Sequence, residues 1–216
     1  HLNVLGGYSY MDNVAEGFGA TRSGFDTNAF IYNNLGAGTD YRQGDVYSYK
    51  NSCKLISFYG RVNYGLMDKY MITATIRRDG SSRFGADHKW GTFPSVSVAW
   101  RIINEKFMEG THSWLDNLKL RVGYGITGNQ NGVDPYKSLS VLSSAGASYY
   151  DAATGTWKNS YVQAQNANPD LKWESTAQFN VGIDFGFLNR INGSLEFYHK
   201  KTSDLLWTYP VPQPPY

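Results

Sequence analysis

Residues 57–77 read SFYGRVNYGLMDKYMITATIR. Apolar or small side chains recur at every second position over residues 58–66 and again over residues 70–76. A period of two is typical of a β-strand with one apolar face. The short segment 67–69 between the two runs predicts a tight turn, so this stretch is expected to form a β-hairpin.

The same alternation continues along the chain, over residues 95–102, 118–127, 177–187 and 191–198. Residues 1–10 predict a further strand, and residues 45–56 an extension of the first one. Residues 104–109 are expected to form one short turn or helix. The predicted fold class is therefore all-β, with the strands arranged as an antiparallel meander.

The two faces of this predicted sheet differ in charge. The apolar positions carry no charged residue, whereas the polar positions carry Arg61, Arg77, Arg101, Lys119, Arg121, Asp184 and Glu196. Such a sheet fits a soluble β-sandwich whose apolar faces meet inside. It fits equally a membrane β-barrel whose apolar face meets lipid and whose polar face lines a lumen. Alternation alone leaves both architectures open.

Connection lengths favour the barrel. The links at residues 67–69 and 188–190 are tight turns and 103–117 is of moderate length, whereas 79–93 and 128–175 are long. In a meander, this places the shorter links at one end and the long loops at the other, as in outer-membrane barrels. Aromatic residues are then expected to mark the membrane boundaries, at Tyr64, Tyr70, Trp100, Phe185 and Phe187 on the short-turn side and at Tyr124 and Trp173 on the other.

The composition agrees with a sheet and excludes several classes. The chain has 17 Tyr, 11 Phe, 6 Trp and 23 Gly, which are strand and turn residues. No apolar run approaches the roughly 18 residues of a transmembrane helix. The net charge of +2 gives no support for a nucleic-acid partner. The single cysteine, Cys53, excludes an internal disulfide framework.

Motifs that would indicate catalysis or a cofactor have simpler explanations. Gly123, Gly125 and Gly128 match the dinucleotide fingerprint, but they alternate within a predicted strand and no helix follows to hold a pyrophosphate. The four histidines lack metal-ligand spacing, and no nucleophile elbow is present. We therefore expect no catalytic residue, no metal and no cofactor.

Two groups of residues are candidates for binding. The seven charged residues of the polar face are candidates for contacts with a substrate or a plug in the lumen; the simpler alternative is that the cations pair with Asp184, Glu196 or residues of a plug. The loop 128–175 places aromatic rings among Ser, Asn and Gly, which suits capture of carbohydrate or peptide, or contact with a partner protein. These aromatic candidates are Tyr136, Tyr149, Tyr150, Trp157 and Tyr161.

Several strings resemble SusC/RagA-type TonB-linked outer-membrane proteins. They are RRDGSSRFG at 77–85, WGTFPSVSVAWR at 90–101, LKLRVGYGITGNQ at 118–130 and NPDLKWE at 168–174, followed by FYHKKTSDLL at 197–206. They occur in the order of that family. The resemblance runs from about residue 53 to the end, and residues 1–52 match more loosely.

The resemblance implies a TonB-dependent nutrient transporter in the outer membrane of a Gram-negative cell, with a multi-pass barrel of about 22 strands. It implies import of oligosaccharides or peptides, energised through the TonB complex, with a SusD-like surface lipoprotein as partner and outer-membrane lipid as surroundings. Residues 1–216 are then expected to be a partial β-barrel domain. The resemblance also implies a plug domain, a TonB box and a C-terminal closing strand, which are expected to lie elsewhere in a longer chain; the Pro-rich stretch at 209–216 reads as a cut edge of that chain.

Two other functions stay open on the sequence. A soluble β-sandwich carbohydrate-binding module would bury Val62, Val98, Leu120 and Ile183 as its core. A surface glycosidase would need two opposed carboxylates, and no acidic spacing in the chain fixes such a pair.

Overall fold

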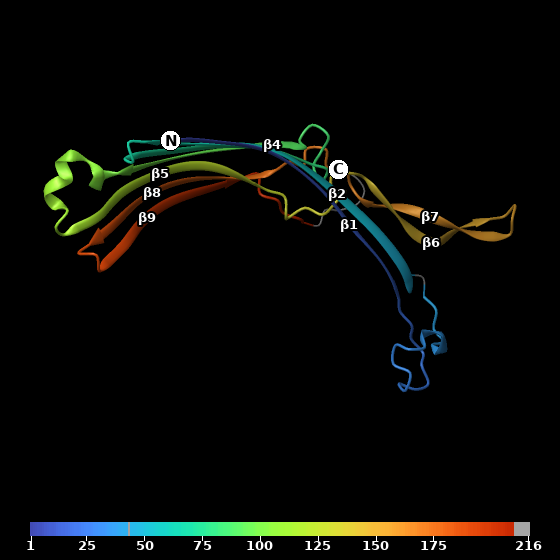
Figure 1. Ribbon diagram of the computed structural model, residues 1–216. Coiled ribbons are helices and arrows are strands. Elements are labelled where there is room, and N and C mark those ends of the chain that lie inside the picture. Colours follow the sequence, from blue (N-terminus) through green and yellow to red (C-terminus); the bar gives the residue numbers. More distant parts are fainter. Residues whose placement is uncertain (43, 210–216) are drawn as a thin grey trace.

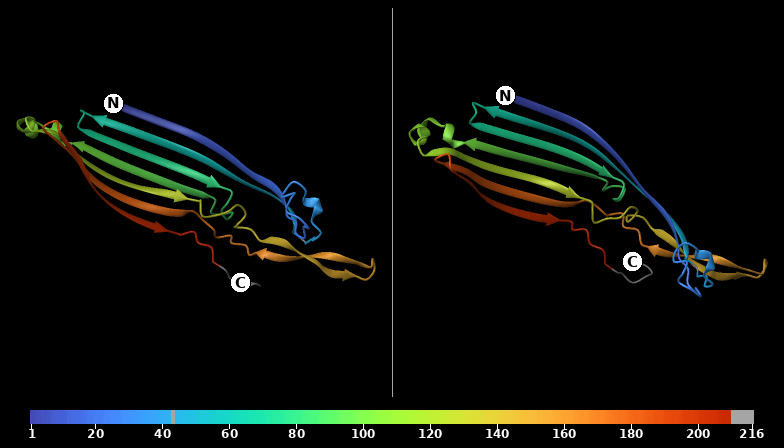
Figure 2. Two further views of the ribbon diagram at one scale, coloured as in Figure 1. Left: turned by 90° about the horizontal axis from the view of Figure 1, so that it is seen from below. Right: turned by 60° about the horizontal axis from the view of Figure 1, so that its bottom comes forward.

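The computed structural model describes residues 1–42 and 44–209, so the Pro-rich stretch 210–216 lies outside the described residues. Seven strands form one antiparallel sheet in the order β1-β2-β3-β4-β5-β8-β9. Figures 1 and 2 show it as a single curved layer with the strands side by side. The predicted all-β meander is thus confirmed. Its strands are β1 (Leu2–Ala20), β2 (Val46–Leu66), β3 (Tyr70–Ser81), β4 (Trp90–Arg101), β5 (Leu115–Asn129), β8 (Glu174–Phe187) and β9 (Ile191–Ser203).

The three shorter links lie at one end of the sheet, as expected. Met67 and Asp68 join β2 to β3 with φ of 52° and 54°, and Leu188 and Asn189 join β8 to β9 with φ of 53° each. Two consecutive residues with positive φ match the twist of a tight antiparallel hairpin. The third link contains the 3-10 turns Ile102–Asn104 and Lys106–Thr111, close to the short helix expected at 104–109.

Strand register gives the sheet two chemically distinct faces. One row across it consists of Tyr64, Ile72, Val98, Val122, Val181 and Phe197. The adjacent row consists of Asn63, Thr73, Ser97, Gly123, Asn180 and Tyr198. Because side chains alternate between faces along each strand, the first row lies on the apolar face and the second on the polar face.

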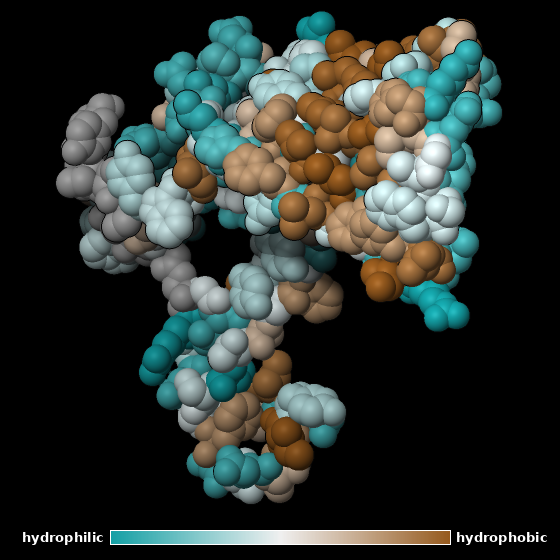
Figure 3. Space-filling model, turned by 90° about the vertical axis from the view of Figure 1, so that its left-hand side faces the viewer, coloured by the Kyte–Doolittle hydropathy of each residue, from teal (hydrophilic) through white to brown (hydrophobic). Residues whose placement is uncertain are grey.

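The apolar face is uncovered among the described residues. Val62, Val98 and Ile183 are 41%, 43% and 40% exposed, and Leu120 is half-buried. Figure 3 shows hydrophobic side chains gathered in a continuous region of the surface. The sandwich alternative is therefore wrong, because these four residues have no second sheet packed on them. This face first carries charge at the long-loop end, at Arg78 and Lys201, so its uncharged middle, without a covering layer, fits contact with lipid.

Two parts of the structure go beyond the expectation. β1 is longer than predicted and runs to Ala20, whereas β2 has the predicted extension over residues 45–56. Because β3 pairs with β2 only from Leu55 onward, the outer parts of β1 and β2 extend as a two-stranded arm. The long loop contains a second, two-stranded sheet of β6 (Val141–Asp151) and β7 (Thr156–Gln165). Figure 1 shows both hairpins projecting from the same end of the main sheet.

No helix among the described residues is long and apolar enough to cross a membrane.

Glu105 organises the short-turn end. Its carboxylate accepts hydrogen bonds from Tyr70 Oη (2.7 Å), Lys69 Nζ (2.9 Å) and Trp100 Nε1 (3.0 Å). The link between β4 and β5 is thereby tied to the start of β3 and the end of β4. The Tyr70 bond, followed by those from Lys69 and Trp100, lowers the pKa of Glu105 from 4.5 to about 2.

The lowered pKa predicts an acid-dependent loss of stability. A carboxylate with a depressed folded-state pKa stabilises the fold above its unfolded pKa, and this contribution disappears as the pH falls through the folded pKa. Glu105→Gln should therefore lower the melting temperature of the barrel near neutral pH. The difference from wild type should shrink between pH 4.5 and about 2, as followed by thermal melts.

Glu109→Gln is the matched control, since Glu109 lies in the same link and its side chain makes no hydrogen bond or ion pair with any described residue. A melting-temperature difference for Glu105→Gln that stays constant down to about pH 2 would contradict this role.

Candidate functional site

Four charged side chains meet on the polar face of β5, β8 and β9. Arg121 donates from Nε to Asp184 Oδ2 (3.0 Å) and from Nη2 to Asp184 Oδ1 (2.8 Å), a two-bond arrangement. Its Nη2 also lies 2.5 Å from Glu196 Oε1, and Lys119 Nζ lies 3.0 Å from Asp184 Oδ2. The two cations and two carboxylates therefore form one network without net charge.

Gly182 makes room for this network. It pairs with Arg121 on one side and with Glu196 on the other, so Arg121 has to reach across it. An ideal Cβ at Gly182 would lie 3.1 Å from Arg121 Nη2 and 3.4 Å from Glu196 Cγ. The absence of a side chain thus lets an arginine on β5 contact a glutamate two strands away.

The other predicted polar-face cations lie apart from this network. Arg77 Nε donates to both carboxylate oxygens of Asp79 at 2.8 Å, and its Nη2 lies 3.1 Å from Ser57 Oγ. Arg61 donates to Thr75 Oγ1 at 3.3 Å. Arg101 has no side-chain partner among the described residues. Pairing with Asp184 or Glu196 is thus found for Lys119 and Arg121, whereas Arg77 pairs with Asp79. A role in substrate or plug contact stays a prediction for all seven.

The strings that carry the family resemblance meet at the long-loop end. Phe84, Phe93, Val133 and Trp173 form a buried cluster, here called the rim core. The Phe84 and Trp173 rings lie 4.8 Å apart, and the Phe93 and Trp173 rings 5.4 Å apart, centroid to centroid. Segments up to about ninety residues apart in the chain are thus joined by aromatic packing. Trp173 was expected at a membrane boundary, which is wrong, because it is 7% exposed and inside this cluster.

Backbone contacts hold the loops of the rim core together. Gly85 N donates to Leu171 O at 2.9 Å, and Trp173 Nε1 donates to Lys89 O at 2.9 Å. Gly85 is in such close contact that an ideal Cβ would lie 1.7 Å from Pro169 O. Only glycine fits there, because the clash is with backbone rather than with a mobile side chain.

Arg83 fixes the loop after β5 to the same region. Its Nη1 donates to Val133 O at 2.6 Å, and its Nη2 lies 3.5 Å from the sulfur of buried Cys53. Arg83 Nε and Gln130 Oε1 are buried without a protein partner among the described residues. Sequence reasoning missed Arg83, since its acceptor is a loop carbonyl that no side-chain pattern identifies.

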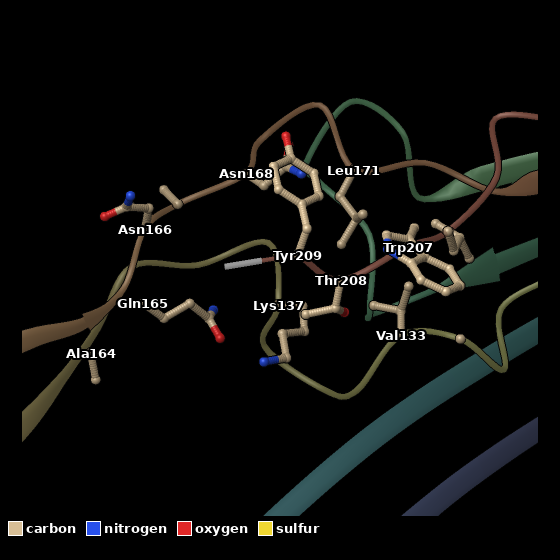
Figure 4. Close-up of a pocket in the computed structure, with 13 residues that line it drawn as sticks. Val133, Lys137, Ala164, Gln165, Asn166, Asn168, Leu171, Trp207, Thr208 and Tyr209 are labelled. Carbon is tan, nitrogen blue, oxygen red and sulfur yellow. The ribbon is translucent and has the colours of Figure 1, made fainter. Parts of the chain in front are cut away.

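An open pocket adjoins the rim core (Figure 4). Its volume is about 740 Å³, within the range of small-ligand sites. Its side chains come from the loop after β5, from the end of β7 and the segment that follows it, and from the segment after β9. They combine apolar Val133 and Leu171 with one cation, three amides and two exposed aromatic rings. These polar and aromatic residues are Lys137, Gln165, Asn166, Asn168, Trp207 and Tyr209.

The predicted outer aromatic residues fall into two sets. Tyr136 anchors its loop to β2, since its Oη accepts from Ser52 N at 3.0 Å and lies 3.1 Å from Ser52 Oγ. The bond with the Ser52 side chain, together with that from its backbone, lowers the pKa of Tyr136 below its ordinary value. Tyr149, Tyr150, Trp157 and Tyr161 instead lie on β6 and β7, exposed by half or more. The structure therefore does not gather all five in one site.

Metal chemistry has no support in the described part of the chain, where no group of three or more His, Cys, Asp or Glu residues is placed to hold an ion.

Comparison with known sequences shows which proteins the chain resembles. Residues 2–216 match the family described as "TonB dependent receptor-like, beta-barrel". The chain is 39% identical to TonB-dependent receptor P3 of Formosa agariphila over 99% of its own length and 21% of that protein. It is 44% identical to TonB-dependent receptor SusC of Bacteroides thetaiotaomicron over 79% of its length and 17% of that protein. It therefore spans about a fifth of these relatives.

Solved structures give the same result for the fold. The RagAB peptide transporter superposes with a TM-score of 0.81 at 29% identity, over 98% of this chain and 22% of that one. The single curved sheet thus corresponds to part of a larger barrel.

Gly85→Ala is predicted to loosen the rim core. The new methyl group would overlap Pro169 O, so the loops have to separate, at a cost on the order of 1–3 kcal/mol or more. We expect faster proteolysis within residues 128–175 and a lower melting temperature. Gly110→Ala is the control, because nothing lies within 4 Å of a Cβ there. Equal proteolysis of the two variants would argue against the packing described.

Proposed function

The chain belongs to the TonB-dependent receptor β-barrel family, and on this premise we propose that it is a wall segment of a SusC/RagA-type outer-membrane transporter. It follows that the chain lies in the outer membrane, as part of a multi-pass barrel. The observation that carries the proposal is the uncharged, uncovered face of a single sheet, with Val98 43% exposed on it. The opposite face, with its charged network, would line the lumen.

The proposal treats residues 1–216 as a partial barrel domain, because the matched relatives are about five times as long. A plug, a TonB box and the closing strand would come from other parts of a longer protein, and import would be energised through the TonB complex. The barrel would have no catalytic residue and need no cofactor.

The proposed cargo is an oligosaccharide or a peptide, and the proposed partner is a SusD-like surface lipoprotein. The relative named SusC and the neighbour described as a peptide transporter support this part. The pocket beside the rim core and the exposed rings of β6 and β7 lie at the long-loop end, where an incoming ligand and a surface partner would arrive.

Lipid contact predicts a strong difference between neighbouring residues of β4. Val98→Arg places a charge in the middle of the apolar face, which should cost about 2–4 kcal/mol in a barrel. Ser97→Arg places the same charge on the polar face, beside Thr73 and Gly123, and should be tolerated. Heat-modifiable migration of the full-length protein in membranes measures assembly of each variant. Equal assembly of the two would be inconsistent with a lipid-facing Val98.

The transport proposal is tested by uptake in cells. Deletion of the full-length gene, or of the TonB that energises it, should abolish accumulation of labelled oligosaccharides or peptides. Complementation with the intact gene should restore it. The surface lipoprotein should co-purify in detergent with the transporter. Uptake that persists in both deletions would contradict the proposal.

A further inference from the structure

Three glycines of β1 are covered by tyrosines of β2. Along the whole of β1, Gly7, Gly17 and Gly19 are the residues that are partly buried, and every other position is exposed. In the register these glycines face Tyr59, Tyr49 and Tyr47 in turn. An ideal Cβ would lie 2.2 Å from Tyr59 Cζ, 2.9 Å from Tyr49 Oη and 2.6 Å from Tyr47 Cζ. Each ring is therefore laid across the neighbouring strand, over a position that has no side chain.

Two of these rings lie on the arm that extends beyond the main sheet. Tyr47 and Tyr49 precede Leu55, the first residue of β2 that pairs with β3. They are 55% and 51% exposed, and their hydroxyls have no partner among the described residues. Since they are two positions apart on one strand, they lie on the same face at a spacing of roughly 7 Å. The arm thus presents two neighbouring, pre-oriented aromatic rings.

The face that carries these rings has no charge. Asn51 follows Tyr49 on this face, opposite Ala15 on β1. The opposite face of the arm carries the ion pairs Lys50–Glu16 and Lys54–Asp12. At its tip, Arg22 and Asp45 lie 3.4 Å apart and neutralise each other. On the strands of the arm, no charged side chain therefore lies on the face of Tyr47 and Tyr49, and the exposed Asp26, Asp40 and Arg42 belong to the tip loop.

We propose that Tyr47, Tyr49 and Asn51, supported by Gly17 and Gly19, form a tyrosine platform that binds a neutral oligosaccharide. Sugar rings have apolar faces that pack on aromatic rings and hydroxyl edges that bond to phenol and amide groups. Peptides and acidic glycans carry charges that this face does not match. The inference rests on the proposed function and selects between its two cargo classes.

A ring over a glycine also shields backbone and stabilises strand pairing, so the test has to separate stability from binding. Gly17→Val keeps both tyrosines but places a side chain where the Tyr49 ring lies. The double variant Tyr47→Ala/Tyr49→Ala removes the rings. Phe18→Ala is the matched control, because Phe18 lies on the opposite face of the same arm and is 90% exposed.

The experiment uses the full-length protein in detergent and a panel of neutral oligosaccharides covering α- and β-linked glucose, mannose, galactose and xylose. We expect at least one to bind. The double variant should bind it roughly tenfold more weakly or worse, and Gly17→Val severalfold more weakly, with Phe18→Ala within about twofold of wild type. Heat-modifiable migration of all four proteins should be unchanged.

Three results would overturn the inference: no binding to any neutral glycan of the panel, binding that both Gly17→Val and the double variant leave unchanged, or equally tyrosine-dependent binding of a peptide library. None of these affects barrel assembly or TonB-dependent uptake, so the tyrosine platform can fail while the proposed function stands.

Discussion

The structure depends on one constraint: in hydrocarbon, every backbone N–H and C=O must find its partner within the protein. A meander meets it by pairing each strand with its neighbours, so the inner strands β2, β3, β4, β5 and β8 are bonded on both sides. Once the backbone is paired this way, side chains can only alternate between the two faces. The apolar row through Val98 and the polar row through Ser97 are the direct consequence.

Several close contacts in the structure depend instead on glycine. At Gly182 it lets Arg121 reach Glu196, at Gly85 it lets two loops touch through their backbones, and at Gly17 and Gly19 it lets tyrosine rings lie across a strand. Each of these glycines lets groups meet that are far apart in the sequence. The rim core collects segments from β3 to β8 in this way and fixes the pocket beside it.

The sequence predicts the strands well because a period of two is a local signal, visible at Tyr70, Ile72, Ala74 and Ile76. It also offers Asp184 and Glu196 as alternative partners for the polar-face cations, since all of them lie on one face, but it does not say which cation meets which carboxylate. It does not predict β6 and β7, whose exposed strands carry weak alternation. It also does not predict the burial of Trp173, which looks like a boundary residue until distant Phe84 and Phe93 enclose it.

The anchoring contacts of Arg83 and Tyr136 could not be predicted for a related reason. Their partners are backbone or edge groups of segments that are remote in the sequence.

The most direct test of lipid contact on the apolar face is to measure solvent accessibility along β4. Single spin labels at residues 95–100 of the full-length protein in bilayers would report collision with oxygen, which concentrates in lipid, and with a polar nickel reagent, which stays in water. The account predicts oxygen maxima at Val96, Val98 and Trp100 and nickel maxima at Ser95, Ser97 and Ala99. A profile without this period, or with Val98 shielded from both reagents, would show that the uncharged face does not meet lipid.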